Sequence, residues 1–192
     1  HEDAEASTET TLRLYEHRYV AVLASLEEGG ARRVVDLGCG EGKFLAQMLA
    51  DRRYDSILGV DVSPRSLMRA EKRLRLDSMP ESQKARLSLI QGSALYRDER
   101  LSGYDAIVLM EVIEHVEPGR LAALEDSVFA SARPATVVVT TPNRDYNAMW
   151  PSLPAGDSRH ADHRFEWTRD EFAAWANRVA SEAMQVLGGA GY

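Results

Sequence analysis

The amino-acid sequence predicts an α/β fold in which helices cover both faces of a twisted, mostly parallel sheet. Short β-branched runs alternate with longer amphipathic segments, which is typical of βαβ units. The first run also ends in a glycine-rich turn that opens a helical segment, an arrangement that lets the backbone approach a ligand. The chain has 192 residues, enough for one domain with a sizeable core.

The predicted elements begin with a helix. Residues 1–10 form an acidic leading segment without Lys or Arg, and a helix is expected over Thr11–Glu27. One face of this helix is apolar and carries Leu12, Tyr15, Tyr19, Val22 and Leu26. The domain itself is expected to span residues 11–192.

Five strands should alternate with three helices in the middle of the chain. The strands are expected over Arg33–Leu37, Ser56–Asp61, Arg86–Gln91, Asp105–Met110 and Thr136–Thr141. The helices are expected over Lys43–Ala50, Pro64–Leu76 and Gly119–Arg133. Ser63 followed by Pro64 is typical of a helix N-terminus.

The C-terminal part is expected to hold a loop and a last helix. Residues of about 143–166 lack periodicity and contain Pro151 and Pro154, and so long a loop in a small domain is usually functional. The sequence Thr168-Arg169-Asp170-Glu171 is a capping box, and it predicts a helix that carries Phe172, Trp175 and Val179 inward.

Composition restricts the function classes. The net charge of −7 argues against a protein that coats nucleic acid through bulk charge, although it falls to −3 once Glu2, Asp3, Glu5 and Glu9 are set aside. No apolar run is long enough to span a membrane, and the only cysteine, Cys39, leaves no intrachain disulfide possible. We therefore expect no membrane partner and a cytoplasmic location.

The glycine-rich turn predicts a cofactor site. Gly38, Gly40 and Gly42 do not have the spacing of the dinucleotide fingerprint, and Asp36 adds a carboxylate suited to an ammonium group. Asp61 ends the second strand, where an acidic side chain accepts hydrogen bonds from ribose hydroxyls. The alternative is that the glycines form only a tight turn and Asp61 only a helix cap.

These residues resemble the first motifs of the class I methyltransferases, which are Rossmann-like and use S-adenosylmethionine (SAM). The resemblance implies that Asp36, Gly38, Gly40 and Asp61 bind SAM, and that Ser93 and Ala94 lie beside its adenine. Such domains usually end in a strand hairpin, and the eight residues after Met184 are too few for it. We therefore expect the final hairpin to be absent, and the chain to be a trimmed, incomplete or atypical domain.

The fourth strand leads into Glu111-Val112-Ile113-Glu114-His115. In a helical turn, Glu111, Glu114 and His115 share a face and could bind one metal ion. Alone this pattern is weak, because small-molecule methyltransferases without metal contain similar strings. His160, Asp162 and His163 in the irregular loop are a second source of ligands.

Together these segments resemble the small-RNA 3′-terminal ribose 2′-O-methyltransferases, which modify plant microRNAs, animal piRNAs and repaired tRNA ends in bacteria. The matching stretches are Asp36–Gly42, Met110–His115, Thr140–Tyr146 and, most specific, His160–Phe172. The resemblance implies that the metal ligands are Glu111, Glu114, His115 and His163. Two carboxylates with two imidazoles suit manganese, cobalt or iron(II) better than magnesium, and manganese is the expected favourite.

The implied chemistry is methylation of the 2′-hydroxyl at an RNA 3′ end. A metal bound by both vicinal hydroxyls would lower the pKa of the 2′-hydroxyl and would also identify the terminal nucleotide. His115 and His160 are the predicted catalytic residues, and His160 and a metal-bound hydroxide both stay open as the base. Arg144, Tyr146 and Trp150 are candidates to hold the terminal nucleotide.

The bacterial relatives carry an N-terminal ligase-related region and act in RNA repair with a polynucleotide kinase-phosphatase. We therefore expect an isolated C-terminal catalytic domain with weakened RNA affinity. Two other hypotheses stay open. One is a metal-independent small-molecule O- or N-methyltransferase with the loop as a lid, and the other is a non-catalytic SAM-fold module that binds RNA or a protein.

Overall fold

A computed structural model describes residues 2–149 and 160–188, with side chains over 15–147 and 160–184. The strands are β1 (Arg33–Leu37), β2 (Ser56–Asp61), β3 (Leu87–Gln91), β4 (Ala106–Met110) and β5 (Thr136–Thr140). The helices are α1 (Glu2–Glu28), α2 (Lys43–Ala50), α3 (Pro64–Leu74), α4 (Glu81–Lys84), α5 (Leu121–Glu125) and α6 (Arg169–Gly188).

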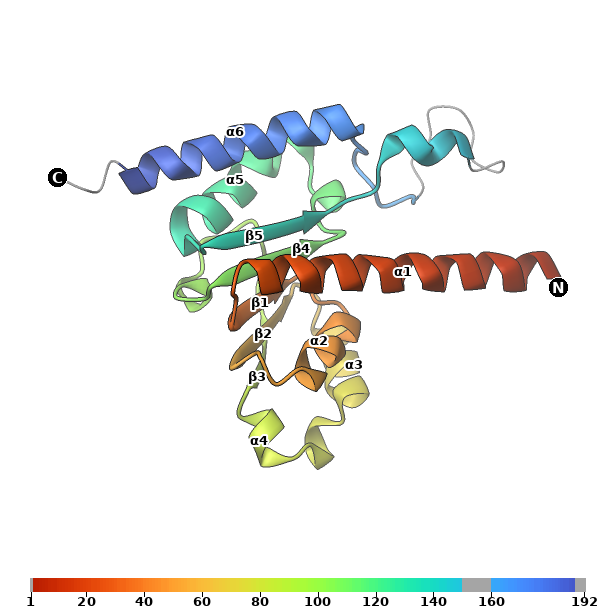
Figure 1. Cartoon of the computed structure of the whole chain (residues 1–192), viewed down its shortest axis with the longest axis vertical. Helices are drawn as coiled ribbons and strands as arrows, with labels where there is room; N and C mark the ends of the chain where they lie inside the picture. The colour runs from red at the N-terminus through yellow and green to blue at the C-terminus, as the bar shows by residue number, and fades with distance from the viewer. Residues whose placement is uncertain (1, 150–159, 189–192) are drawn as a thin grey trace.

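The strands form one sheet in the order β3-β2-β1-β4-β5, and every pair is parallel (Figure 1). Val35 at the centre pairs with Leu58 of β2 and Ile107 of β4. The strand order reverses between β1 and β4, and α/β sheets bind ligands at the carboxyl ends of the strands at such a point. The predicted parallel sheet is confirmed.

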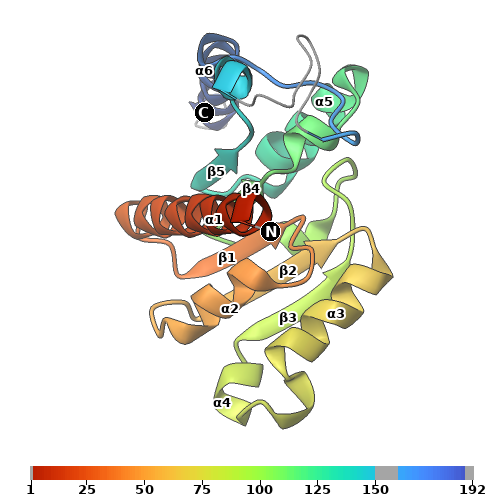
Figure 2. The same cartoon turned by 90° about the vertical axis from the view of Figure 1, so that its right-hand side faces the viewer.

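Helices cover both faces of the sheet, as predicted. Alternate residues of each strand face opposite layers, so that Val34 packs with α1 and α2 while Val35 packs with α5 and α6. Figure 2 shows α1, α2 and α3 on one side of the strands and α5 and α6 on the other. Both layers bury apolar side chains fully, including Leu26 of α1 and Leu124 of α5.

The predicted boundaries need correction at three helices. α1 begins at Glu2 rather than Thr11, and acidic residues are favourable in a first helical turn. α3 ends at Leu74 because Arg75 takes a left-handed conformation with φ 52°. The helix predicted over Gly119–Arg133 is instead a 3-10 turn (Pro118–Arg120), α5 and a π-helical segment (Asp126–Ala132). The strand boundaries agree to within one residue.

Both predicted helix starts are confirmed. The Ser63 hydroxyl accepts a hydrogen bond from the Ser66 amide at 3.2 Å. At α6 the Glu171 carboxylate accepts from the Thr168 amide at 2.8 Å, and the Thr168 hydroxyl accepts from the Glu171 amide at 3.2 Å. This capping box fixes the direction of α6, which buries Trp175 and Val179.

No strand follows α6 within residues 2–149 and 160–188. None of the helices in the same ranges combines the length and apolarity needed to cross a bilayer.

Candidate functional site

In the described part of the chain, two adjoining cavities lie at the carboxyl ends of β1, β2, β3 and β4. The larger, of about 490 Å³, is lined by the glycine-rich turn, the end of β4, part of α1 and the loop histidines. The smaller, of about 260 Å³, is lined by residues that follow β2, β3 and β4. Gly38 and His115 line both cavities, so the two hollows adjoin at these residues.

The glycine-rich turn needs its glycines. Gly38 has φ 94°, and a Cβ there would lie 2.6 Å from Cγ2 of Val112. Gly42 has φ 75° and precedes α2, where a Cβ would lie 3.0 Å from Cβ of Ala70. The turn therefore packs directly against the segment after β4 and against α3, and it leaves backbone rather than side chains at the cavity wall.

Asp36 lies at the large cavity and is 2% exposed. Burial raises the pKa of its carboxyl group to about 7, and the charge of Asp61 adds to this effect. A cationic group in the cavity would favour the ionised form of Asp36. The residue therefore fits the ammonium-bearing ligand inferred from the sequence.

Asp61 holds the turn together. Its Oδ2 accepts from the Gly40 amide and its Oδ1 from the Ser63 amide, both at 2.8 Å. An ionised carboxylate offers about four acceptor positions, so Asp61 can serve as a cap and still accept from a ribose hydroxyl. Asp61 lines the smaller cavity together with Ser93 and Ala94, which is where the sequence analysis expected adenosine.

The segment after β4 is not the regular helical turn that we predicted. Glu111 has a left-handed conformation with φ 55°, and a 3-10 helix covers Ile113–His115. The Glu111 amide still donates to the Thr140 carbonyl at 3.0 Å, so the residue continues the pairing of β4 with β5. The chain then turns sharply, buries Ile113 fully and leaves Val112 against Gly38.

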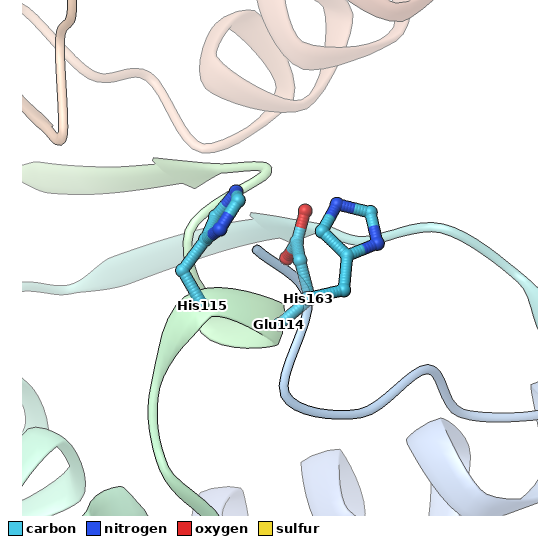
Figure 3. A group of neighbouring side chains, drawn as sticks. All are labelled: Glu114, His115 and His163. Carbon is cyan, nitrogen blue, oxygen red and sulfur yellow. The ribbon is translucent and has the colours of Figure 1, made fainter. Parts of the chain in front are cut away.

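Three predicted metal ligands come together. Glu114, His115 and His163 each offer one ligand atom, and these atoms lie within 4.8 Å of one another. Figure 3 shows the Glu114 carboxylate between the two imidazoles, with His163 on the separate segment before α6. The His163 segment is tied to this turn because the Arg164 amide donates to the Glu114 carbonyl at 2.7 Å.

The Glu114 side chain is fully buried and has unused acceptor capacity. Its Oε2 accepts from the Thr141 hydroxyl at 3.1 Å, whereas Oε1 has no hydrogen-bond partner among the described residues. Burial raises the pKa of Glu114 to about 7. An orphaned buried oxygen beside two imidazoles fits a divalent cation, which would stabilise the carboxylate in its ionised form.

Both histidines are oriented through Nδ1. The Nδ1 atom of His115 lies 3.3 Å from the Asp162 carbonyl oxygen, and that of His163 lies 2.7 Å from Oε1 of Glu166. Carbonyl and carboxylate oxygens accept only, so each Nδ1 carries the proton. In the neutral imidazoles Nε2 then keeps the lone pair that binds a metal.

Glu111 lies at the same cavity but outside this group of three. Its Oε2 forms an ion pair with Arg18 of α1 at 3.1 Å, and its Oε1 accepts from the Thr140 hydroxyl at 3.0 Å. The sequence-based ligand set is therefore brought together only in part. The left-handed conformation of Glu111 accounts for its different direction.

His160 lines the large cavity, with its ring centre 5.6 Å from that of His163. Arg144 and Tyr146 lie on a 3-10 helix (Arg144–Met149) inside the segment predicted to be irregular. Tyr146 is 49% exposed, and Arg144 is paired with Glu171 at 3.1 Å. Trp150, Pro151 and Pro154 lie outside the described residues.

The sequence analysis missed several residues at the site. Tyr15, Arg18 and Tyr19 of α1 line the large cavity, although the spacing of Tyr15 and Tyr19 indicates only a buried face and Arg18 lies outside that face. Thr140 and Thr141 hold the two glutamates. Glu166 was part of the quoted motif but had no role, and a carboxylate three residues after a proposed histidine ligand could have suggested one.

Comparison with known proteins places this geometry in context. A family model described as a methyltransferase domain matches residues 9–179. The small RNA 2′-O-methyltransferase of Mus musculus is 37% identical over 186 residues, which cover 92% of this chain and 46% of the relative. The protein of the same name from Arabidopsis thaliana is 33% identical and is covered over 19% of its length. The chain spans about half the length, or less, of the curated relatives it matches.

Solved structures agree with these relatives. The methyltransferase domain of bacterial CtHen1-C is 49% identical with a TM-score of 0.80, covering 88% of this chain and 85% of that one. A structure of the small RNA methyltransferase HEN1 has a TM-score of 0.79 at 33% identity, covering 88% of this chain and 21% of that one. A SAM-dependent methyltransferase from Archaeoglobus fulgidus, at 17% identity and a TM-score of 0.58, shares the fold.

Proposed function

The chain belongs to the methyltransferase-domain family and, within it, to the small-RNA 2′-O-methyltransferases of the Hen1 type, and we propose that it transfers a methyl group from SAM to the 2′-hydroxyl of the 3′-terminal nucleotide of RNA. The observation that carries this proposal is the group of Glu114, His115 and His163 in the cavity that Asp36 and Gly38 also line. The residues that would bind a cationic methyl donor and a metal are thus adjacent.

The two cavities account for the two parts of SAM. Asp61, Ser93 and Ala94 line the smaller cavity, where adenosine would bind. Asp36, Gly38 and Gly40 line the larger one, where the ammonium group would face the Asp36 carboxylate. Gly38 lines both cavities and therefore lies between the two parts of SAM, and Val112 packs where a Cβ of Gly38 would lie.

A divalent metal belongs to the proposal, with Glu114, His115 and His163 as its ligands and Glu111 as a fourth candidate beside them. When bound, such an ion lowers the pKa of a hydroxyl on the substrate and recognises the vicinal 2′,3′-diol. We expect manganese to support activity better than magnesium, because imidazole ligands suit the softer ion. Cobalt should also support activity.

Transfer is a matter of placement and proton removal. The 2′-oxygen must lie in line with the sulfur-carbon bond of SAM, so that the oxygen-carbon bond forms as the sulfur-carbon bond breaks. The 2′-hydroxyl proton must leave, and His160 at the wall of the same cavity is our candidate to accept it. His115, a member of the group of three, lines both cavities and therefore lies beside the proposed SAM site.

The testing experiment compares two RNA ends. The protein is incubated with labelled SAM, Mn²⁺ and a short RNA that ends in either a 2′,3′-diol or a 3′-phosphate, and the label is mapped. We expect methylation of the diol RNA alone, and its loss in Glu114→Ala and in chelator. Equal labelling of both RNAs would contradict recognition of the diol, and activity that survives chelation would favour a metal-independent methyltransferase.

The biological setting is a wider proposal that the resemblance supports. RNA-end repair would require a polynucleotide kinase-phosphatase to supply the 2′,3′-diol. A 3′-phosphate is esterified to the 3′-oxygen, so the free 3′-hydroxyl that would bind the proposed metal is missing. A cytoplasmic setting would suit such repair. Co-purification of the full-length protein with that enzyme activity would test the partnership.

A further inference from the structure

We propose that Glu166 is a positioning residue that fixes the tautomer and orientation of the metal ligand His163, and that Asn147 couples it to the loop after β5. This inference rests on the proposed function, because it concerns the same metal site. The contacts that carry it, however, are formed by this chain alone.

The contact between Glu166 and His163 is short and enclosed. Oε1 of Glu166 lies 2.7 Å from Nδ1 of His163, and the two side chains are 2% and 9% exposed. A carboxylate accepts but does not donate, so the proton of neutral His163 lies on Nδ1. The lone pair is thereby confined to Nε2, and the ring cannot rotate without breaking a charge-assisted hydrogen bond.

A buried carboxylate at this position calls for a physical explanation. Removal of a carboxylate from water costs several kcal/mol unless partners compensate for the loss. The residues on either side of Glu166 in the sequence, Phe165 and Trp167, are apolar and pack against each other with ring centres 4.6 Å apart. The Glu166 carboxylate contacts His163, and carboxylates commonly orient metal-binding imidazoles in this way.

Asn147 supplies the second contact of the carboxylate. Its Nδ2 donates to Oε2 of Glu166 at 2.6 Å. The two carboxylate oxygens are therefore held by side chains from two different segments, Oε2 by Asn147 and Oε1 by His163. Asn147 belongs to the 3-10 helix Arg144–Met149, which also carries the exposed Tyr146. Glu166 therefore links the segment that carries Tyr146, a candidate contact of the terminal nucleotide, with the ligand that we propose for the metal.

The first test measures the metal alone. Mn²⁺ is titrated by calorimetry into wild type, Glu166→Gln and Glu166→Ala in the absence of RNA. We expect Mn²⁺ to bind ~10-fold more weakly to Glu166→Gln, which keeps the volume and an acceptor oxygen, and up to ~100-fold more weakly to Glu166→Ala. With Co²⁺ as the probe, the visible absorption spectrum should change in the same order.

The matched control is Asp162→Asn. Asp162 is also a carboxylate beside a loop histidine, at 3.6 Å from Nδ1 of His160, but it is 77% exposed. This substitution removes one negative charge near the site, as Glu166→Gln does. We expect it to change Mn²⁺ affinity by less than about twofold, because an exposed charge is screened. SAM affinity should stay unchanged in all variants and reports on the fold.

The second test needs no metal. Long-range nitrogen-proton NMR correlations of the imidazoles should identify the Nδ1-protonated tautomer for neutral His163 in wild type and a mixture in Glu166→Ala. Wild-type Mn²⁺ affinity in both Glu166 variants, with SAM binding intact, would overturn this inference while leaving the metal site in place. Failure of wild type itself to bind Mn²⁺ would overturn both the inference and the metal in the proposed function.

Discussion

The cofactor half of the site, at the ends of β1 and β2, is built from backbone, whereas the acceptor half, at the ends of β4 and β5, is built from side chains. The first half depends on left-handed glycines and on amides that Asp61 holds. The second half gathers Glu114, His115 and His163 from two segments far apart in the sequence. A short continuous motif can specify the first arrangement, but only the whole fold specifies the second.

The halves also hold their charges differently. Asp61 accepts hydrogen bonds from two backbone amides, one on each carboxylate oxygen. Oε2 of Glu114 accepts from the Thr141 hydroxyl, whereas its Oε1 has no hydrogen-bond partner in the part of the chain that the structure describes. Asp36 and Glu114 nevertheless share one property, because burial raises the pKa of each carboxyl group to about 7. The two halves should therefore respond separately to substitution, and each should respond strongly at its buried carboxylate.

The largest expected effect is at Glu114. Glu114→Gln keeps the volume of the side chain but loses the charged ligand, so RNA methylation should fall roughly 10³-fold or more, beyond the ~10–100-fold effect of residues that only support a ligand. SAM affinity should change by less than about twofold, as measured by calorimetry. A comparable loss of SAM binding would show that the halves are not separate.

Asp36→Asn should separate stability from cofactor binding. The folded-state pKa of about 7 lies above the ordinary aspartate value of 3.8, so ionisation destabilises the fold as pH rises from about 4 to about 7. At pH 8 the variant should be more stable by on the order of 4 kcal/mol as an upper bound. Its SAM affinity should fall ~10–100-fold, because a charge-assisted hydrogen bond is lost.

Denaturant unfolding at several pH values measures the effect of Asp36→Asn. The stabilities of wild type and variant should converge below pH 4, where the carboxyl group is neutral in both the folded and the unfolded state. Equal stability at pH 8 would mean that Asp36 is already paired with a cation in the free protein.

Gly38→Ala probes the point at which the halves meet. The left-handed φ alone costs about 1–2 kcal/mol for a residue with a Cβ, and this Cβ would lie 2.6 Å from Val112. We expect SAM affinity to fall ~10-fold or more and Mn²⁺ affinity to fall as well, since Val112 precedes the ligand turn. In Gly38→Ala/Val112→Ala, Mn²⁺ affinity should recover whereas SAM affinity should not. Recovery of both would assign the whole effect to the clash.

The same difference explains which features the sequence predicts. The β-branched runs place the strands to within one residue, because a buried parallel strand requires such residues over its whole length. The sequence around Gly38, Gly40 and Gly42 predicts the turn, since few other residues accept these backbone angles. The cofactor half is thus legible from local sequence.

The acceptor half can be predicted from the sequence only in part. Helical periodicity groups Glu111 with Glu114 and His115, but the left-handed φ of Glu111 separates it from them. Thr140 reaches Glu111 because Met110 pairs with Thr140 in the sheet, and strand order cannot be read from spacing. Arg18 of α1 contacts Glu111, which lies 93 positions later in the sequence, and spacing alone does not predict this contact either. Periodicity does not reach His163, which is indicated by the cluster of histidines in the loop and by the resemblance.

The smallest expected effect is at Arg18, and it tests whether Glu111 belongs to the acceptor half. Arg18 is 16% exposed and holds Glu111 at 3.1 Å, away from the group of three ligands. In Arg18→Gln the carboxylate is free to turn toward the cation. We expect Mn²⁺ to bind about threefold more tightly, which matches the ~1 kcal/mol or less of a partly exposed ion pair.

Lys43→Gln is the matched control for Arg18→Gln. Both cations lie over the ring of Tyr15, at 5.2 Å for Arg18 and 5.7 Å for Lys43, and both line the large cavity. Loss of either removes one positive charge from the same wall, but only Arg18 contacts Glu111. If the two variants bind Mn²⁺ equally, the gain is general electrostatics. If Mn²⁺ affinity rises in Arg18→Gln but not in Arg18→Gln/Glu111→Gln, Glu111 is a metal ligand that its ion pair with Arg18 keeps away from the cation.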